Sequence, residues 1–173
     1  MTEADKLREL AEQKFTQDQL TLGGMYYTDR SYHTERSVIG PNDLKLETYA
    51  HEMTRYTFMK QFATDEVLDI GCSSGYGSAI LNAKSYTGLD YNKEIIEFAN
   101  KNYGNERTKF YHKNIYDLLK TDFFSDTIIA SECLEHLADG REIAQELKKH
   151  CNTLLITVPY REPVGYWGKY HLI

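Results

Sequence analysis

The chain has 173 residues, of which 41% are hydrophobic and 27% are charged, a composition typical of one soluble globular domain. Its net charge of −6, from 20 basic and 26 acidic residues, disfavours a broad nucleic-acid-binding face, because such a face needs an excess of positive charge. No apolar run approaches the roughly 20 residues that span a bilayer, and the polar N-terminus with Glu3 and Asp5 is unlike a signal peptide, so we predict a cytoplasmic protein without a membrane partner.

Two helices and a loop are predicted in the first 62 residues. Apolar residues recur at helical spacing among charged ones over 2–18, and again over 46–62. The segment 23–41 is rich in tyrosine and basic residues and has little periodicity, so it predicts either a packed loop or a substrate-binding lid. We assign 1–62 to a cap or lid that belongs to the same domain as the core at 63–173.

From residue 66 onwards, short apolar runs alternate with helical stretches, and this pattern predicts a parallel β-sheet wrapped by helices. The expected strands lie near 66–70, 85–89, 108–111, 126–130 and 153–158. The expected helices lie near 75–83, 92–103 and 140–149. The right-handed crossover rule and a topological switch point beside the first strand place a ligand at the carboxyl ends of the first, second and fourth strands.

The first expected strand runs directly into a glycine-rich turn within 67–78. Glycine lacks a Cβ, so Gly71, Gly75 and Gly77 permit positive φ and a close approach of the backbone to a ligand. The second strand ends at Asp90, nineteen positions after Gly71, where a carboxylate can accept hydrogen bonds from both hydroxyls of a ribose. Together the two features predict a pocket for a nucleotide-type cofactor.

The spacing of the glycines indicates which cofactor binds. A dinucleotide fingerprint reads Gly-x-Gly-x-x-Gly and places a pyrophosphate on the next helix, whereas this chain reads Gly71-x-x-x-Gly75-x-Gly77. Asp69 lies two residues before the first glycine, where an acid would repel a phosphate and would suit a cationic amino group. S-adenosylmethionine carries both an amino-acid end and a nucleoside end, so the pattern favours this cofactor.

At these residues the chain resembles the class I S-adenosylmethionine-dependent methyltransferases, over about residues 45–160. Their first motif often reads Val-Leu-Asp-Ile-Gly-Cys-Gly-x-Gly-Tyr-Gly-Ser, and this chain has Ser73 in place of the middle glycine. The resemblance implies an α/β, Rossmann-like parallel sheet of order 3-2-1-4-5. The family sheet continues into strands six and seven, yet this chain stops at Ile173, so we expect a sheet without them. Either a homodimer or another partner covers its edge, or the chain is truncated.

The resemblance also implies the cofactor contacts. The turn after the first strand would hold the methionine portion, with Asp69 facing its amino group, and Asp90 would bind the ribose. Tyr91 would flank the adenine, while Asn114 and the N–H of Ile115 would bond to its edge. The predicted cofactor-binding residues are therefore Asp69, Gly71, Ser73, Gly75, Asp90, Tyr91, Asn114 and Ile115.

The segment after the fourth strand holds the candidate catalytic residues, His136 and Glu132. If a helix begins near Glu132, then Glu132, Glu135 and His136 lie at i, i+3 and i+4 on one face of one turn. In one interpretation these three side chains, with His171 as a fourth ligand, bind a divalent cation such as Mg²⁺. The resemblance to plant small-RNA 2′-O-methyltransferases and some quinone O-methyltransferases implies this role. In a second, His136 alone is the general base, and in a third the segment is only structural.

The leading hypothesis is an S-adenosylmethionine-dependent methyltransferase that O-methylates a small molecule, a sugar or a glycan precursor. The aromatic loop at 161–171, with Trp167 at its centre, is either a wall for that acceptor or a shield for the sheet. Three alternatives stay open. The first is a metal-dependent RNA 2′-O-methyltransferase-like enzyme, which the acidic net charge opposes. The second is a non-catalytic S-adenosylmethionine-binding module. The third is a nicotinamide oxidoreductase, which would be expected to carry the Gly-x-Gly-x-x-Gly order instead.

Overall fold

The computed structural model describes residues 38–45 and 50–159. The predicted helix at 2–18, most of the tyrosine-rich segment at 23–41 and the aromatic loop at 161–171 lie outside these residues. The described part contains the predicted core from its first strand to its fifth.

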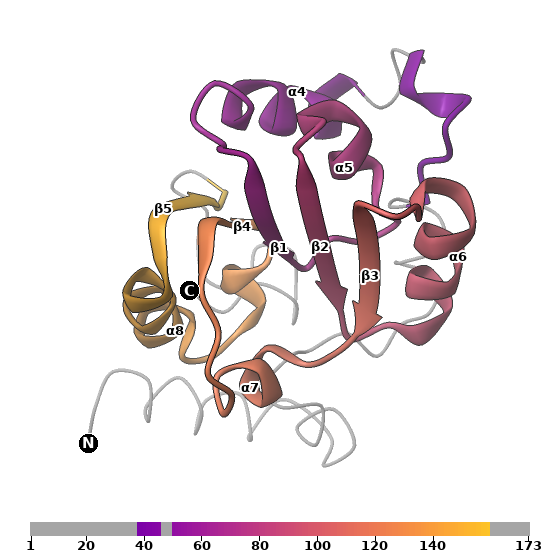
Figure 1. Cartoon of the computed structure of the whole chain (residues 1–173). Coiled ribbons are helices and arrows are strands. Elements are labelled where there is room, and N and C mark those ends of the chain that lie inside the picture. The colour runs from indigo at the N-terminus through magenta and orange to yellow at the C-terminus, as the bar shows by residue number, and fades with distance from the viewer. Residues whose placement is uncertain (1–37, 46–49, 160–173) are drawn as a thin grey trace.

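Five parallel strands form one sheet in the order β3-β2-β1-β4-β5 (Figure 1). The strands are β1 (Glu66–Ile70), β2 (Ser85–Asp90), β3 (Thr108–His112), β4 (Ser125–Ser131) and β5 (Cys151–Thr157). Ile70 at the end of β1 pairs with Leu89 of β2 on one side and with Ala130 of β4 on the other. The strand order reverses beside β1, so the carboxyl ends of β1, β2 and β4 meet at one edge. The predicted Rossmann-like α/β fold is confirmed, as are its five strands and their order.

Helices connect the strands and cover both faces of the sheet (Figure 1). The α-helices are α4 (Ala50–Met59), α5 (Tyr76–Leu81), α6 (Lys93–Tyr103), α7 (Ile115–Leu118) and α8 (Gly140–Leu147). Short 3₁₀ helices are η1 (Asp43–Lys45), η3 (Leu134–His136) and η4 (Lys148–His150). None of the helices in the described ranges has the length and apolar character that a bilayer crossing requires.

Side chains alternate across the sheet and build a separate core on each face. On one face, Val67, Tyr86 and Ile129 pack beneath α4, α5 and α6. On the other face, Leu68 and Ile128 pack against α7, η3 and α8. Because both faces of the central strands are buried, their sequences are nearly continuous apolar runs, and this is why the sequence predicted them well.

Local capping sets the helix ends. Asn92 caps α6, because its side chain accepts the backbone N–H of Ile95 at 3.1 Å. Helix α5 stops before its predicted end, because Asn82 takes a left-handed φ of 49°. The predicted helix at 140–149 is α-helical only as far as Leu147 and continues as the 3₁₀ turn η4.

Strand β5 is an edge of the sheet in the described part of the chain, where it pairs with β4 alone. Ile156 on this strand and Val158 just after it are 37% and 48% exposed. Strands six and seven of the family sheet are not found among the described residues. Coverage of this edge by a second copy or another partner stays a prediction.

Candidate functional site

The turn between β1 and α5 holds three residues in left-handed backbone geometry. These are Gly71 (φ 74°), Ser73 (φ 50°) and Gly75 (φ 87°). A Cβ at Gly71 would lie 2.8 Å from the sulfur of Cys133, and one at Gly75 would lie 2.7 Å from the ring of Phe110. Both glycines are therefore required by backbone conformation and by packing.

Hydrogen bonds anchor this turn to the end of β2. The N–H groups of Gly71 and Cys72 both donate to the carbonyl of Leu89, at 2.8 and 3.0 Å. The N–H of Ser73 donates to Oδ2 of Asp90 at 3.1 Å. The glycine turn and the acid that closes the second strand therefore form one unit at the carboxyl edge of the sheet, where the sequence predicted them.

Ser73 of the glycine motif takes a left-handed conformation although it has a Cβ, whereas Gly77 does not take one. Ser73 replaces the usual glycine and still takes a left-handed φ of 50°, a conformation that costs a residue with a Cβ roughly 1 to 2 kcal/mol. Gly77 lies inside α5 without a positive φ, so it does not use the conformational freedom that glycine permits. A Cβ at Gly77 would lie 2.4 Å from the ring of Tyr56, so this glycine instead lets α4 pack closely on α5.

Gly75→Ala is expected to destabilise the fold by about 2 kcal/mol. Alanine in the left-handed region costs roughly 1 to 2 kcal/mol, and its Cβ would press on the ring of Phe110, 2.7 Å away. Urea unfolding followed by circular dichroism measures the change. The matched control in the same turn is Ser73→Gly, which removes a Cβ from a left-handed residue and should leave the free energy of unfolding unchanged or higher. Equal losses in the two variants would contradict the argument.

Asp90 is a buried carboxyl that links the two halves of the turn. Its Oδ2 accepts the N–H of Ser73, and its Oδ1 accepts the N–H of Asn92 at 2.9 Å. Burial raises the pKa of Asp90 to about 6, and these backbone hydrogen bonds oppose the rise. A carboxylate oxygen can accept more than one hydrogen bond, so both oxygens keep capacity for the two hydroxyls of a ribose.

Asp69 is buried on the α4, α5 and α6 face of the sheet. Oδ2 of Asp69 accepts the hydroxyls of Tyr56, at 2.9 Å, and of Tyr86. Its Oδ1 is buried and has no hydrogen-bond partner among the described residues. Burial raises the pKa of Asp69 to about 7, and the two tyrosine hydrogen bonds act against this rise. Sequence reasoning did not foresee either tyrosine partner.

The predicted adenine contacts lie beside Asp90. The N–H of Lys113 donates to the carbonyl of Asp90 at 2.9 Å, which holds the β3–α7 connection against the end of β2. Asn114 caps α7, with its Oδ1 accepting the N–H of Tyr116 at 3.0 Å. Ile115 is the first residue of α7, and the N–H groups of a first helical turn lack intrahelical acceptors. The adenine roles of Asn114 and Ile115 stay predictions.

Tyr91 follows Asp90 and is half-buried against the core on the α7 face. Burial is the largest cause that raises the pKa of its hydroxyl well above the usual range, and the charge of Asp90 adds to the effect. Tyr91 therefore lies beside Asp90, the acid predicted to bind the ribose. This position is compatible with the predicted contact between Tyr91 and the adenine. The stacking itself stays a prediction.

The helix predicted to begin near Glu132 is not formed. Strand β4 runs to Ser131, Glu132 takes a left-handed φ of 49°, and the 3₁₀ helix η3 begins only at Leu134. Glu132, Glu135 and His136 therefore do not share one face of a helical turn, because the condition for it, a helix that begins near Glu132, is not met. The N–H of Glu132 instead donates to the carbonyl of Thr157 at 3.0 Å, which ties the end of β4 to β5.

The predicted metal site is not assembled from these residues. The side chains of Glu135 and His136 are buried, with Nε2 of His136 3.7 Å from Oε1 of Glu135, while Glu132 is half-buried. Within the described ranges there is no group of three or more His, Cys, Asp or Glu side chains placed to hold a metal ion. His171, the fourth predicted ligand, lies outside those ranges. The backbone turn at Glu132 is the physical reason that the predicted ligand face does not form.

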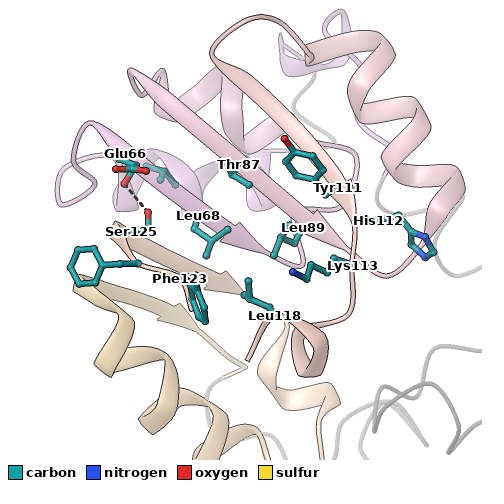
Figure 2. A pocket seen from close by; sticks show the side chains of 12 residues that line it. Glu66, Leu68, Thr87, Leu89, Tyr111, His112, Lys113, Leu118, Phe123 and Ser125 are labelled. Carbon is teal, nitrogen blue, oxygen red and sulfur yellow. Dashed lines mark hydrogen bonds between the residues drawn. The ribbon is translucent and has the colours of Figure 1, made fainter. Parts of the chain in front are cut away.

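A cavity of about 490 Å³ lies on the α7 face of the sheet (Figure 2). Leu68 and Leu89 of the strands, Leu118 of α7 and Phe123 of the following loop line it. Its twelve lining residues include none of the predicted cofactor contacts. Sequence reasoning missed this cavity, because its existence depends on how much of the sheet the single turn of α7 covers.

Comparison with known proteins identifies the family. A family model described as a methyltransferase domain matches residues 68–153, from β1 into β5. A probable S-adenosylmethionine-dependent methyltransferase of Mycolicibacterium smegmatis is 26% identical over 114 residues, which are 65% of this chain and 44% of that protein. Residues 68–153 match the methyltransferase domain family, and the fold is that of a class I S-adenosylmethionine-dependent methyltransferase.

Solved structures of other methyltransferases share the fold. The magnesium protoporphyrin IX methyltransferase of Synechocystis, with bound S-adenosylmethionine, is similar with a TM-score of 0.63 and 17% identity, over 84% of this chain and 79% of that one. The plantazolicin methyltransferase BpumL, in complex with S-adenosylhomocysteine, is similar with a TM-score of 0.56 and 20% identity, over 85% of this chain and 57% of that one. The matched part spans less than half the length of the curated mycobacterial relative.

Proposed function

We propose that this chain binds S-adenosylmethionine and transfers its methyl group to an oxygen of a small molecule, a sugar or a glycan precursor. The observation that carries the proposal is the hydrogen bond from the Ser73 N–H to Asp90. It joins the left-handed turn after β1 to the acid that closes β2, at the edge where open α/β sheets bind their ligands. The family membership of the chain supports the same cofactor.

The residues at this edge fit the chemistry of the cofactor. Asp90 offers two carboxylate oxygens for the ribose, and the turn at 71–75 brings backbone rather than side chains to the site. Asp69 offers a buried oxygen without a hydrogen-bond partner among the described residues, which suits a cationic amino group. A dinucleotide fits less well, because the buried acid Asp69 beside the turn would repel a pyrophosphate.

When bound, the cofactor supplies a methyl group activated by a sulfonium. The contribution of the chain is to hold and orient the reactants, which can lower a barrier by roughly 7 to 11 kcal/mol in favourable cases. An acceptor hydroxyl must also lose its proton, and we assign this step to the imidazole of His136, with Glu132, at the turn that ends β4, as the second candidate. Nε2 of His136 lies 3.7 Å from Oε1 of Glu135.

The charge of the chain and the geometry after β4 favour this acceptor class over RNA. The net charge of −6 opposes a polyanionic acceptor. The RNA-methyltransferase alternative also depended on a metal bound by Glu132, Glu135 and His136, and these residues do not form the helical ligand face it needs. The non-catalytic alternative loses support as well, because Ser73 adopts the left-handed conformation that the turn requires.

Calorimetric titration with S-adenosylhomocysteine and, separately, with NADH tests the cofactor. We expect the first compound to bind and the second not to, because the glycine order and Asp69 beside the turn disfavour a pyrophosphate. Tight binding of NADH without binding of S-adenosylhomocysteine would overturn the proposal. Transfer of labelled methyl from S-adenosylmethionine to a panel of phenols, sugars, glycan precursors and RNA oligonucleotides then tests the acceptor. Cofactor binding without transfer to any of them would favour a binding module.

A further inference from the structure

Asp69 is held by tyrosines from two different elements. Tyr56 comes from α4 and Tyr86 from β2, and both hydroxyls donate to the same oxygen, Oδ2. Both rings are almost fully buried, at 2% and 1% exposure. The ring of Tyr86 packs 5.7 Å from that of Phe110, and Tyr56 meets Tyr76 edge-on at 5.2 Å. The two donors are therefore fixed by packing, and they fix the carboxyl plane of Asp69 in turn.

The second carboxylate oxygen of Asp69 differs from the first in its hydrogen bonding. Oδ1 is buried and has no hydrogen-bond partner among the described residues. Among the described residues, the groups that act on this carboxyl are the hydroxyls of Tyr86 and Tyr56 and the carboxyl of Asp90, and none of these three is a cation. Cys72 of the turn and Tyr76 of α5 also face Asp69, and neither carries positive charge. A buried carboxylate in this setting is strongly stabilised by a cation or donor that reaches its open oxygen.

We propose that Tyr56 and Tyr86 are positioning residues that hold Asp69 with Oδ1 presented to the cationic amino end of the cofactor, directly or through one water. This inference rests on the proposed function. It adds two residues to the site that the glycine motif does not contain. By occupying Oδ2 together, the hydroxyls leave a single oxygen for the ligand and fix its direction.

The arrangement makes cofactor binding depend on pH in a defined way. The ammonium group binds the ionised carboxyl, so affinity for S-adenosylhomocysteine rises as pH rises through the pKa of Asp69, which burial raises to about 7. The tyrosine hydrogen bonds favour the ionised form. Removal of either hydroxyl therefore raises this pKa further and moves the binding midpoint to higher pH. The amino group of S-adenosylhomocysteine lies beside the ligand's own carboxylate, which favours the protonated form, so it stays a cation over the range from about pH 5 to about pH 8.5.

The test compares two ligands over that pH range by calorimetry with the full chain. S-adenosylhomocysteine has the amino-acid end, and 5′-methylthioadenosine lacks it but keeps the ribose and the adenine. For Tyr86→Phe and Tyr56→Phe we expect about tenfold weaker binding of S-adenosylhomocysteine near pH 6 and a midpoint about one pH unit higher. Binding of 5′-methylthioadenosine should stay within about twofold, because both variants keep Asp90 and its hydrogen bonds to the turn.

Tyr103→Phe is the matched control, because it also removes a tyrosine hydroxyl, one that donates to the carbonyl of Ile39 at 2.8 Å. It should not shift the midpoint. Titration of the Asp69 carboxyl by carbon-13 NMR in the ligand-free protein gives a second readout, with a higher midpoint expected in each of the two variants. If both ligands weaken equally and neither midpoint moves, the tyrosines are only structural and the inference is overturned. If neither ligand binds the wild-type chain, the proposed function itself has failed.

Discussion

Asp90→Ala is expected to weaken the binding of S-adenosylhomocysteine by about 100-fold. Hydrogen bonds to a charged group contribute roughly 1.5 to 3 kcal/mol each, and the variant removes two that the ribose would make. Each 1.4 kcal/mol is a factor of about ten in affinity. The variant also removes the acceptor of the Ser73 N–H, which anchors the glycine turn to the end of β2. Calorimetry at neutral pH measures the loss.

Two controls accompany this variant. Asp65→Ala removes a carboxyl from a surface ion pair with Lys84, at the opposite end of β1, and should leave affinity unchanged. Asp90→Asn keeps one oxygen acceptor and should lose less affinity than Asp90→Ala. Circular dichroism shows whether each variant is folded. Wild-type affinity in folded Asp90→Ala would remove Asp90 from the cofactor site.

The ligand-free protein is expected to lose stability as pH rises from about 4 to about 7. Burial raises the pKa of Asp69 from 3.8 to about 7, and that of Asp90 from 3.8 to about 6. A carboxyl with a raised pKa in the folded state stabilises the fold below its unfolded pKa, and this contribution disappears as pH rises through the folded value. For Asp69 the change over this window is roughly 4 kcal/mol, at 1.36 kcal/mol for each unit of pKa.

Asp69→Asn should reduce the slope of this pH profile without abolishing it, because asparagine does not ionise whereas Asp90 still does. Urea unfolding at several pH values between about 4 and 8 gives the free energy of unfolding for both proteins. The slope is the diagnostic quantity, since the new amide N–H₂ can itself lack a partner and lower stability equally at every pH. Asp65→Asn, on the exposed surface, should keep the wild-type slope. Parallel profiles for Asp69→Asn and the wild type would show that this carboxyl does not titrate in the window.

The sheet and the cofactor turn could be predicted because their signals are local. A central strand of a parallel sheet is buried on both faces, so β1 and β4 are visible as apolar runs in the sequence. The turn needs left-handed backbone at Gly71 and Gly75, and glycine is the residue that tolerates it. Asp90 is the last residue of the next strand along the chain, β2. Residues adjacent in the chain carry all of these features.

The segment after β4 could not be predicted in the same way. The residues from Glu132 to His136 have helical spacing, and a helix beginning at Glu132 was a reasonable inference from it. The structure instead turns the backbone at Glu132 and bonds its N–H to Thr157, a residue 25 positions later in the sequence. The partner that decides the backbone there lies in β5, so no local pattern encodes it.

The amino-acid sequence by itself determined the fold class and the pairing of a glycine turn with the acid at Asp90, because these follow from periodicity and from the conformational freedom of single residues, while the strand order was implied by the family resemblance. Only the tertiary structure decided that Gly77 serves the packing of α4 on α5 and that Asp69 bonds to Tyr56 and Tyr86. The tyrosine hydroxyls lie 13 and 17 positions from Asp69 along the chain. Folding brings them to one carboxylate oxygen, and the chemistry of the site depends on that convergence.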